Sequence, residues 1–571
     1  MTALLTDNLP LLAGAPNGIK KLRELILELA VRGKLVPQDT NDEPASELLK
    51  RIAEEKARLV AEGKIRKPKQ QPRAGEDDIP FVLPNGWAVE RLGVTSHLIT
   101  KGTTPTTLGH AYTSSGISFV KVENIESRRI SKTAISQFIS PETDELMSRS
   151  RLEAGDVLFS IAGTIGKTCS IQKEDLPANT NQALAIIRGT STVFLQDFLL
   201  SQLDSFVSEK TKERARGGAM PNVSLGDLSD LVLVIPPLAE QHRIVAKVDE
   251  LMALCDRLEA RQADADSAHA QLVQALLDSL TQARDAEDFA QSWQRLAEHF
   301  HTLFTTESSI DALKQTLLQL AVMGKLVPQD PNDEPASELR KRIAEEKASL
   351  VAKGKIKKQK SLAEIAAGDM LFDLPTSWVW GRLSELTLKI TDGTHHSPTN
   401  TKVGDYKYIS AKNIKSWGVD LTDVTYVANE VHQEIFSRCD PSKGDILYIK
   451  DGATTGIATI NSLDEPFSML SSVALLKPSL GLHNEYMLKA MVSPIFYRAM
   501  RADMAGVAIT RVTLAKLNNA VIPLPPLAEQ HRIVAKVDQL MALCDQLKAR
   551  LHQARQVHEQ LANALVEQAV A

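Results

Sequence analysis

The chain contains two near-identical frames, and each frame surrounds a stretch that differs between the copies. Residues 33–60 return as residues 324–351, and residues 236–256 return as residues 525–545. Only four positions in these blocks differ, namely Thr40/Pro331, Leu49/Arg340, Arg58/Ser349 and Glu250/Gln539. The period of about 290 residues is far longer than the repeat of a solenoid protein. The sequence therefore predicts a duplicated multidomain unit, in which two equivalent frames carry two different domains.

Composition limits the class of protein. Hydrophobic residues make up 43% and charged residues 24% of the chain, as in ordinary globular proteins. The net charge of −5 argues against a histone-like protein, although a local basic groove is compatible with it. The four cysteines lack zinc-type spacing, and the sequence has neither an 18-residue apolar run nor a secretory leader. We therefore expect a reduced, cytoplasmic protein that binds no metal.

The frames have the periodicity of helices. Apolar residues at helical spacing predict one helix over residues 19–31 and a second over residues 44–62. The same two helices are predicted again near residues 311–323 and 335–353.

A long apolar stripe follows each second block. After Pro236 and again after Pro525, apolar residues keep a spacing of three or four for roughly 40 residues, which is about 60 Å of helix. Alanine and glutamine dilute both stripes, so each helix alone would be only marginally stable. We expect the two helices to pair with each other and to form the core of a helix pair, not a membrane span or a cofactor site.

The two inserts between the frames share a skeleton. Both open with the motif Leu-Pro-x-x-Trp, and both contain a Gly-Asp-(Val/Ile)-Leu-(Phe/Tyr) run that begins at Gly155 or Gly444. Short β-branched and aromatic runs bounded by Gly, Asp and Asn predict strands, whereas residues 194–210 and 483–500 are predicted to be helical. Each insert is therefore predicted to be an α+β domain with a curved sheet. The predicted boundaries are an N-terminal helical region (1–82), a first insert (83–235), a long central helix (236–282), a linker with the second helical region (283–373), a second insert (374–524) and a C-terminal long helix (525–571).

No motif in the sequence indicates catalysis. The run from Gly163 to Thr168 resembles a phosphate-binding loop, but GxxxxGK[ST] requires a glycine where Ile161 stands. A tight turn between two strands, with Lys167 near a phosphate, fits the run better. Signatures of amino-methyl transfer, zinc hydrolysis and serine hydrolysis are also missing from the sequence. We therefore expect no catalytic residue and no metal ligand in this chain.

Polar and basic loop residues occur in both inserts but differ between them. Arg and Lys can bond guanine O6 and N7, Asn can bond adenine, and other cations can fix the register on phosphates. In the first insert the predicted DNA-binding residues are Lys101, Thr103, Thr104, Lys121, Asn124, Arg128, Arg129, Lys167, Lys210, Lys212, Arg214, Arg216 and Asn222. In the second insert they are His395, His396, Lys412, Asn413, Lys415, Lys450, Arg498, Arg501 and Arg511. The alternative is a solvated surface, since the first insert has 15 Lys and Arg residues against 16 Asp and Glu residues.

The doubled pattern resembles the specificity subunit of type I restriction-modification systems. The resemblance lies in the Leu-Pro-x-x-Trp openings, the Gly-Asp strands and the Pro-Pro-Leu-Ala-Glu-Gln-His-Arg-Ile runs at 236–244 and 525–533. Residues 19–38 are similar to the type IB branch of that family. The resemblance implies an α+β chain with two α/β target-recognition domains in a tandem pseudo-two-fold repeat, separated by long antiparallel coiled-coil-like helices.

The resemblance also implies partners. It predicts that the chain binds double-stranded DNA, reads a bipartite site with one domain per half, and carries two modification subunits and two restriction subunits. It predicts that S-adenosylmethionine, ATP and magnesium are bound by those partners and that this chain binds no cofactor. Two other classes stay open: a scaffold or anti-restriction protein that binds only proteins, and a DNA-modifying enzyme, which the missing motifs disfavour.

Overall fold

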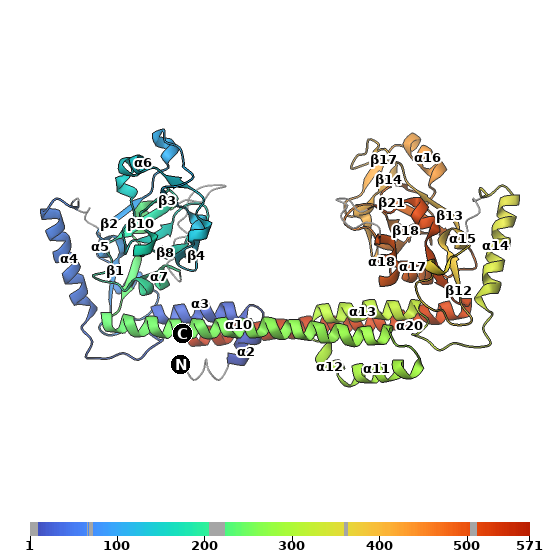
Figure 1. Cartoon of the computed structure of the whole chain (residues 1–571), viewed down its shortest axis with the longest axis horizontal. Helices are drawn as coiled ribbons and strands as arrows, with labels where there is room; N and C mark the ends of the chain where they lie inside the picture. Colours follow the sequence, from blue (N-terminus) through green and yellow to red (C-terminus); the bar gives the residue numbers. More distant parts are fainter. Residues whose placement is uncertain are drawn as a thin grey trace. The chain divides into compact units, whose positions relative to one another are not determined.

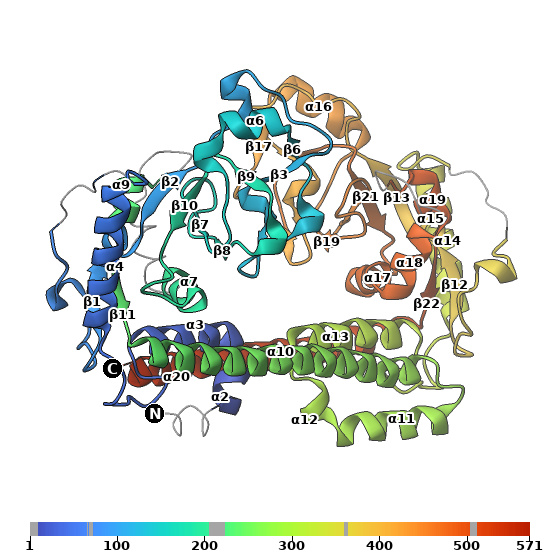
Figure 2. The ribbon, with the colours of Figure 1, turned by 60° about the vertical axis from the view of Figure 1, so that its left-hand side comes forward.

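The computed structural model describes residues 9–65, 67, 72–204, 223–358, 364–502 and 511–570. The chain divides into two units, and each is described separately. The first unit comprises residues up to Asp264 together with Ala554–Ala571, and the second comprises Ala265–Gln553. Figures 1 and 2 show the elements of each unit in sequence colours.

Two long helices contribute to both units. Helices α10 (Leu238–Thr281) and α20 (Leu527–Val570) are each 44 residues long, about 66 Å at 1.5 Å per residue. In the first unit, Ile244 of α10 shares an apolar core with Ala562 of α20. In the second unit, Val273 of α10 shares a core with Cys544 of α20. The first part of each helix thus packs with the last part of the other, as in antiparallel helices, which confirms the predicted pairing.

The predicted helical pairs are present in both units. They are α3 (Gly18–Val31) and α4 (Ala45–Ala61) in the first unit, and α13 (Glu307–Val322) and α14 (Ala336–Ala352) in the second. Helix α3 ends because Gly33 adopts a left-handed conformation, with φ of 67°, and the Lys34 amide donates to the Leu29 carbonyl at 2.9 Å. A Cβ on Gly33 would also lie 2.6 Å from the ring of Pro84, so both backbone and packing require glycine there.

The segment before α13 is helical, although the sequence analysis treated its first part as a linker. Helices α11 (Ala286–Glu298) and α12 (Phe300–Leu303) lie between α10 and α13. Asp285 caps α11 by accepting a hydrogen bond from the Asp288 amide at 2.8 Å. Leu296 and Leu303 join the core formed with α13. In the first unit the short helix α2 (Leu9–Gly14) precedes α3.

The first insert is an α+β domain whose two ends pair. Strand β1 (Ala88–Arg91) runs antiparallel to β11 (Val232–Ile235), so the insert begins and ends at one place. Its main sheet has the order β2-β10-β7-β8, from β2 (Leu98–Lys101), β10 (Leu184–Arg188), β7 (Val157–Ser160) and β8 (Thr168–Ser170). A second sheet has the order β6-β3-β9, from β6 (Phe138–Ile139), β3 (Ile117–Val120) and β9 (Ala178–Thr180). The remaining elements are α5 (Leu92–Thr95), α6 (Pro141–Leu146), α7 (Gln196–Asp204), α9 (Leu225–Ser229) and the hairpin β4 (Ile125–Glu126) and β5 (Arg129–Ile130).

The second insert repeats the topology. Strand β12 (Val379–Arg382) pairs with β22 (Val521–Leu524) and closes the domain in the same way. The main sheet is β13-β21-β18-β19, from β13 (Thr387–Asp392), β21 (Val473–Pro478), β18 (Ile446–Ile449) and β19 (Ala458–Ile460). The second sheet is β17-β14-β20, from β17 (Thr425–Val427), β14 (Tyr406–Ile409) and β20 (Ser468–Met469). The remaining elements are α15 (Leu383–Leu386), α16 (Asn429–Arg438), α17 (Asn484–Met491), α18 (Pro494–Arg501), α19 (Leu514–Asn519) and the hairpin β15 (Ile414–Lys415) and β16 (Gly418–Val419).

The predicted helix over residues 483–500 is two helices. Ser493 accepts a hydrogen bond from the Phe496 amide and Pro494 opens α18, so a cap and a proline separate α17 from α18. In the first domain α7 covers the beginning of the predicted helix over 194–210, and residues 205–210 lie outside the described part of the chain.

Candidate nucleic-acid interface

A buried polar junction fixes each insert domain to its frame. The indole Nε1 of Trp87 donates to Oε2 of Glu240 at 2.9 Å, and Nε2 of Gln38 donates to the other carboxylate oxygen at 3.2 Å. The second unit repeats both bonds, from Trp378 at 2.8 Å and Gln329 at 2.6 Å to Glu529. Burial raises the pKa of Glu240 and of Glu529, although the hydrogen bonds from Trp and Gln oppose the shift.

A half-buried lysine makes a second attachment in each unit. Nζ of Lys56, on α4, donates to the carbonyl oxygens of Gly93 at 2.9 Å, Val94 at 3.1 Å and Ser96 at 2.9 Å. Lys347 of α14 likewise donates to carbonyl oxygens of α15, those of Ser384 and Glu385. Burial lowers the pKa of Lys347 to about 8. These lysines therefore belong to the frame, and the position of each insert domain follows from frame residues.

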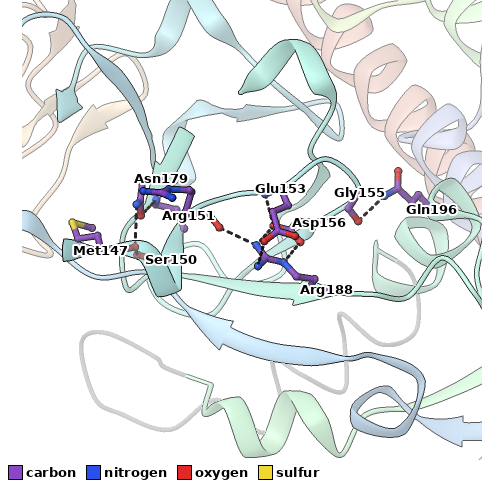
Figure 3. A network of polar contacts seen from close by, with 10 residues as sticks. Met147, Ser150, Arg151, Glu153, Gly155, Asp156, Asn179, Arg188 and Gln196 are labelled. Carbon is purple, nitrogen blue, oxygen red and sulfur yellow. Dashed lines mark hydrogen bonds and ion pairs between the residues drawn. The ribbon is translucent and has the colours of Figure 1, made fainter. Parts of the chain in front are cut away.

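The Gly-Asp run organises the middle of each main sheet. Figure 3 shows Arg188 of β10 beside Asp156, to which its Nε and Nη2 donate at 2.7 Å each. The Gly155 carbonyl accepts a hydrogen bond from Gln196 of α7 at 2.7 Å. In the second domain Lys477 binds Asp445 at 2.7 Å and Asn484 binds the Gly444 carbonyl at 2.7 Å. The run is therefore a structural feature of the fold, and sequence analysis did not identify Arg188 or Lys477 as its partners.

The loop that follows β2 or β13 crosses the second sheet very closely. A Cβ on Gly102 would lie 2.2 Å from the Thr180 carbonyl oxygen, and one on Gly393 would lie 1.8 Å from that of Met469. The Thr103 amide donates to the Thr180 carbonyl at 3.1 Å, and the Thr104 hydroxyl bonds Gln182. Glycine at the same place in both domains thus fixes a loop whose neighbouring side chains differ.

Strand register shows which of these side chains correspond. Lys101 pairs with Ala185, and Asp392 pairs with the equivalent Ala474. The position that is a half-exposed lysine in the first domain is therefore a buried aspartate in the second. The two domains therefore differ in both charge and exposure at one place in the same fold.

Asp392 is the centre of a charged network in the second domain. Its carboxylate contacts Arg438, His395 at 3.4 Å and Nζ of Lys450 at 3.5 Å. Lys450 is only 1% exposed and also donates to Asp451 at 2.9 Å. Arg511 reaches Asp451 at 3.3 Å and is exposed, as is His395. The structure therefore brings the predicted residues His395, Lys450 and Arg511 together, with Lys450 buried beneath the other two.

Two predicted asparagines support turns. Oδ1 of Asn124 accepts from the Lys121 amide at 2.8 Å, and its Nδ2 donates to the Ala134 carbonyl at 2.7 Å. Asn413 is held in the same way between the Ser410 amide at 3.1 Å and the Asp420 carbonyl at 3.0 Å. Both residues are buried, and these backbone groups already engage their amides. Neither asparagine could bond a base without giving up these bonds to the backbone.

Three predicted cations of the first domain bind within the domain. Nε of Arg128 donates to Asp204 at 2.6 Å, and Nη1 of Arg129 donates to the Ser170 hydroxyl at 2.9 Å. Lys167 lies at the end of the connection between β7 and β8, residues 161–167, which is longer than the predicted tight turn, and its Nζ donates to the Ile125 carbonyl at 3.1 Å. Arg129 is nevertheless exposed. Lys210, Lys212, Arg214, Arg216 and Asn222 lie outside the described residues.

The other predicted residues belong to the hairpin regions, to α18 and, for His396, to the loop after β13. Lys121 has Nζ 5.4 Å from the centroid of the Tyr112 ring, and Lys412 is exposed and pairs with Asp423 at 2.7 Å. His396 is exposed and its amide donates to the Thr394 hydroxyl at 3.3 Å. The remaining three are Lys415 on β15 and Arg498 and Arg501 on α18.

A cavity of about 700 Å³ lies beside α18. The exposed Arg498 lines it together with Tyr497, Thr454 of the β18–β19 turn and Ser416 of the hairpin. Arg501 lies with its guanidinium 5.1 Å from the Tyr497 ring centroid, and its Nη1 donates to the Thr455 carbonyl at 3.5 Å. Gln315 and Leu318 of α13 also line the cavity, and Nη2 of Arg498 donates to Gln319 of the same helix at 3.3 Å, so cations and an aromatic ring meet where the second domain faces its frame.

The described residues contain no cluster of His, Cys, Asp or Glu that could hold a metal ion. Among the same residues, no helix is long and apolar enough to cross a membrane.

The fold and these polar networks define a class of protein in which two unlike α+β domains are locked onto two copies of one helical frame. Comparison with known proteins supplies the family. The family described as Type I restriction modification DNA specificity domain matches residues 84–265 and 375–554. The EcoAI specificity subunit of Escherichia coli is 38% identical over 97% of this chain and 94% of that protein. The EcoEI specificity subunit of Escherichia coli is 36% identical over the same shares of the two chains.

The chain therefore belongs to the family of type I restriction-modification specificity subunits, and it has two recognition domains. A solved structure from work on complex assembly and conformational transition of the type I R-M system is also similar. It covers 86% of this chain and 99% of its own, with 21% sequence identity and a TM-score of 0.48.

Proposed function

We propose that this chain reads a bipartite, asymmetric DNA target, with one recognition domain on each half-site. The observation that carries the proposal is the contrast between Lys101 and Asp392, which occupy one place in two domains of the same topology. A lysine can donate to guanine or to a phosphate, whereas an aspartate can only accept or hold other donors. Two domains that place a half-exposed lysine and a buried, paired aspartate at one position of the same scaffold are suited to unlike half-sites.

The side chains that we propose to contact DNA are basic or polar, and each is exposed or half-exposed in the structure. Phosphate contacts would set the register of each domain, and base contacts would select the sequence. In the first domain these side chains are Lys101, Thr103, Thr104, Lys121, Arg128 and Arg129. In the second domain they are His395, His396, Lys412, Lys415, Arg498, Arg501 and Arg511. Lys167, which is half-exposed, belongs to the same set, whereas the buried Lys450 acts indirectly by holding Asp392 and Asp451.

The duplicated frames would carry two copies of each partner subunit. Lys50, Arg51 and Glu54 of α4 are exposed, and so are their identical counterparts on α14, which are Lys341, Arg342 and Glu345. Core packing does not require exposed residues to be identical, but docking of the same partner twice does. A recent duplication explains the identity of the frames, yet it does not explain why only the inserts have diverged.

Catalysis would then belong to the partners. We propose two modification subunits that use S-adenosylmethionine and two restriction subunits that use ATP and magnesium, with no cofactor on this chain. A subunit that reads chromosomal DNA acts where the DNA is, and we place the complex in the cytoplasm.

The test is a gel-shift series on random duplexes, with and without the modification subunit, followed by methylome sequencing of a host that carries the genes. We expect a selected target of two unlike half-sites separated by a fixed number of unspecified bases. A complex that assembles but selects no sequence would favour the protein-only scaffold. Methyl transfer by the purified chain alone would favour the enzyme.

A further inference from the structure

The hairpin β15–β16 of the second recognition domain presents a tryptophan to solvent. Trp417 lies in the turn between Lys415 and Gly418 and is 72% exposed. The other four tryptophans of the chain are 4% to 40% exposed, so Trp417 is the most exposed of the five. Exposing an indole leaves a large apolar area in water, and aromatic residues on protein surfaces are enriched where ligands bind.

The exposure occurs in a well-supported turn. Asn413 bonds the Ser410 amide and the Asp420 carbonyl, and the Asp420 amide donates to the Asn413 carbonyl at 2.7 Å. These bonds fix the base of the hairpin on both sides. The asparagine that sequence analysis assigned to adenine therefore positions the hairpin, and the turn residue is the one that is presented.

The first domain has the same hairpin with a different tip. Strands β4 and β5 pair as β15 and β16 do, and Asn124 supports them as Asn413 does. Arg128 occupies the place of Trp417, and its guanidinium is bonded to Asp204 and Ser201. The two hairpins are supported in the same way but carry different residues in their turns, which is the arrangement expected for a position that sets specificity.

The residues around Trp417 suit a ligand that combines negatively charged phosphates with aromatic bases. Lys415 precedes the turn, and Ser416 lines the cavity that also contains Tyr497 and Arg498. Aromatic rings beside cations are the combination with which proteins bind nucleic acid, because the rings stack on bases while the cations meet phosphates.

We propose that Trp417 is a specificity-determining residue that wedges its indole into a base step of the half-site read by the second domain, stacks on the base that it unstacks, and so selects steps that open readily. The inference deepens the proposed function and rests on it. The proposed ligand of Trp417 is duplex DNA. Contact of Trp417 with a partner subunit is the competing result that the experiment must distinguish.

The experiment uses the full chain assembled with its modification subunits and compares wild type with Trp417→Ala, Trp417→Phe and Leu480→Ala. Leu480 is 91% exposed in the same domain, on the loop next to α14, and serves as the matched apolar control. Affinity is measured for the target duplex and for a duplex whose second half-site is scrambled. Quenching of tryptophan fluorescence by target DNA is recorded for each protein.

We expect Trp417→Ala to weaken target binding roughly 5- to 150-fold, the range for losing one base–aromatic stack. Trp417→Phe should retain most of the affinity, Leu480→Ala should bind as wild type does, and the quenching should be lost in both Trp417 variants. The scrambled duplex should bind Trp417→Ala and wild type alike. The melting temperature of Trp417→Ala should stay close to that of wild type, because the side chain is exposed.

If Trp417→Ala and wild type bind the target with equal affinity, the inference about Trp417 is wrong, but the proposed function still stands. Failure of Trp417→Ala to retain the modification subunits, with unchanged affinity per assembled complex, would also overturn the inference and assign Trp417 to a protein contact. A wild-type complex without sequence preference would refute the proposed function itself.

Discussion

The indole Nε1 of Trp87 donates to Oε2 of Glu240 at 2.9 Å, and this bond joins the opening of the first recognition domain to the first turns of α10. The same bond recurs between Trp378 and Glu529 at 2.8 Å. In the sequence these residues belong to separate motifs, Leu-Pro-x-x-Trp and Pro-Pro-Leu-Ala-Glu-Gln-His-Arg-Ile. The structure shows that the two motifs are the two halves of one junction, which explains why both are repeated while the inserts diverge.

Replacing Trp87 with Phe should destabilise the first unit. The substitution keeps most of the apolar ring but removes the donor to a carboxylate that is 1% exposed. A buried acceptor that loses its partner costs about 1–3 kcal/mol. Urea unfolding followed by circular dichroism measures the loss. Trp293→Phe is the control, because that side chain is 40% exposed and its replacement should change the free energy of unfolding by less than about 0.5 kcal/mol. Equal stability of the two variants would contradict the role of the bond.

Glu240→Gln should change how stability depends on pH. Burial raises the pKa of Glu240 above 4.5, so the folded state holds its proton more tightly than the unfolded state does. This contribution to stability is present below pH 4.5 and is lost as the pH rises through the raised pKa. Glutamine does not titrate and keeps an acceptor for Trp87. The free energy of unfolding of the variant, relative to wild type, should therefore increase from pH 4 to pH 7, and a flat difference would show that the carboxyl group is not perturbed.

The frame was predictable from sequence because its signals are local and repeated. Helices α3, α4, α13 and α14 were expected to within a few residues, since apolar periodicity and a glycine stop mark them. Helix α11 was not expected, because only Asp285 as a cap and a few apolar residues distinguish it from a linker.

The candidate site was less predictable because residue type does not reveal burial. Lys450 and Asn413 have the chemistry of DNA contacts, yet both are buried and hold other groups. Arg188 was missed because its partner Asp156 lies 32 positions earlier in the sequence. Trp417 gave little signal, because only one apolar residue flanks the paired positions 415 and 418 on each side, Ile414 and Val419, which is too short a pattern to predict strands.

Lys450→Met should reduce the stability of the second domain. Asp392 and Lys450 are both almost fully buried, and removing the ammonium leaves the carboxylate with Arg438 and His395 only. Breaking a buried pair costs about 3 kcal/mol. The double variant Asp392→Asn with Lys450→Met should regain part of this loss, because the uncompensated charge is gone. A variant with normal melting temperature but weakened DNA binding would instead place Lys450 in direct contact with DNA.

Replacing residues 83–235 with the corresponding insert of a relative should change one half-site of the target. The insert begins and ends at the antiparallel pair β1–β11, where Ala88 lies opposite Ile235, so the exchange leaves α4 and α10 intact. Methylome sequencing should show a new first half-site, the original second half-site and the original gap. A simultaneous change in both half-sites would contradict independent reading by the two domains.

Lengthening both long helices together should lengthen the gap between the half-sites. A heptad inserted after Asp264 and another after Gln553 enter α10 and α20 where each passes from one unit to the other. Seven residues keep the apolar stripes in phase and add about 10 Å. At about 3.4 Å per base pair the target should gain about three unspecified positions. A heptad in only one helix leaves seven residues without a partner, and we expect that variant to lose assembly. An active complex with matched heptads and an unchanged gap would show that another part of the chain sets the spacing.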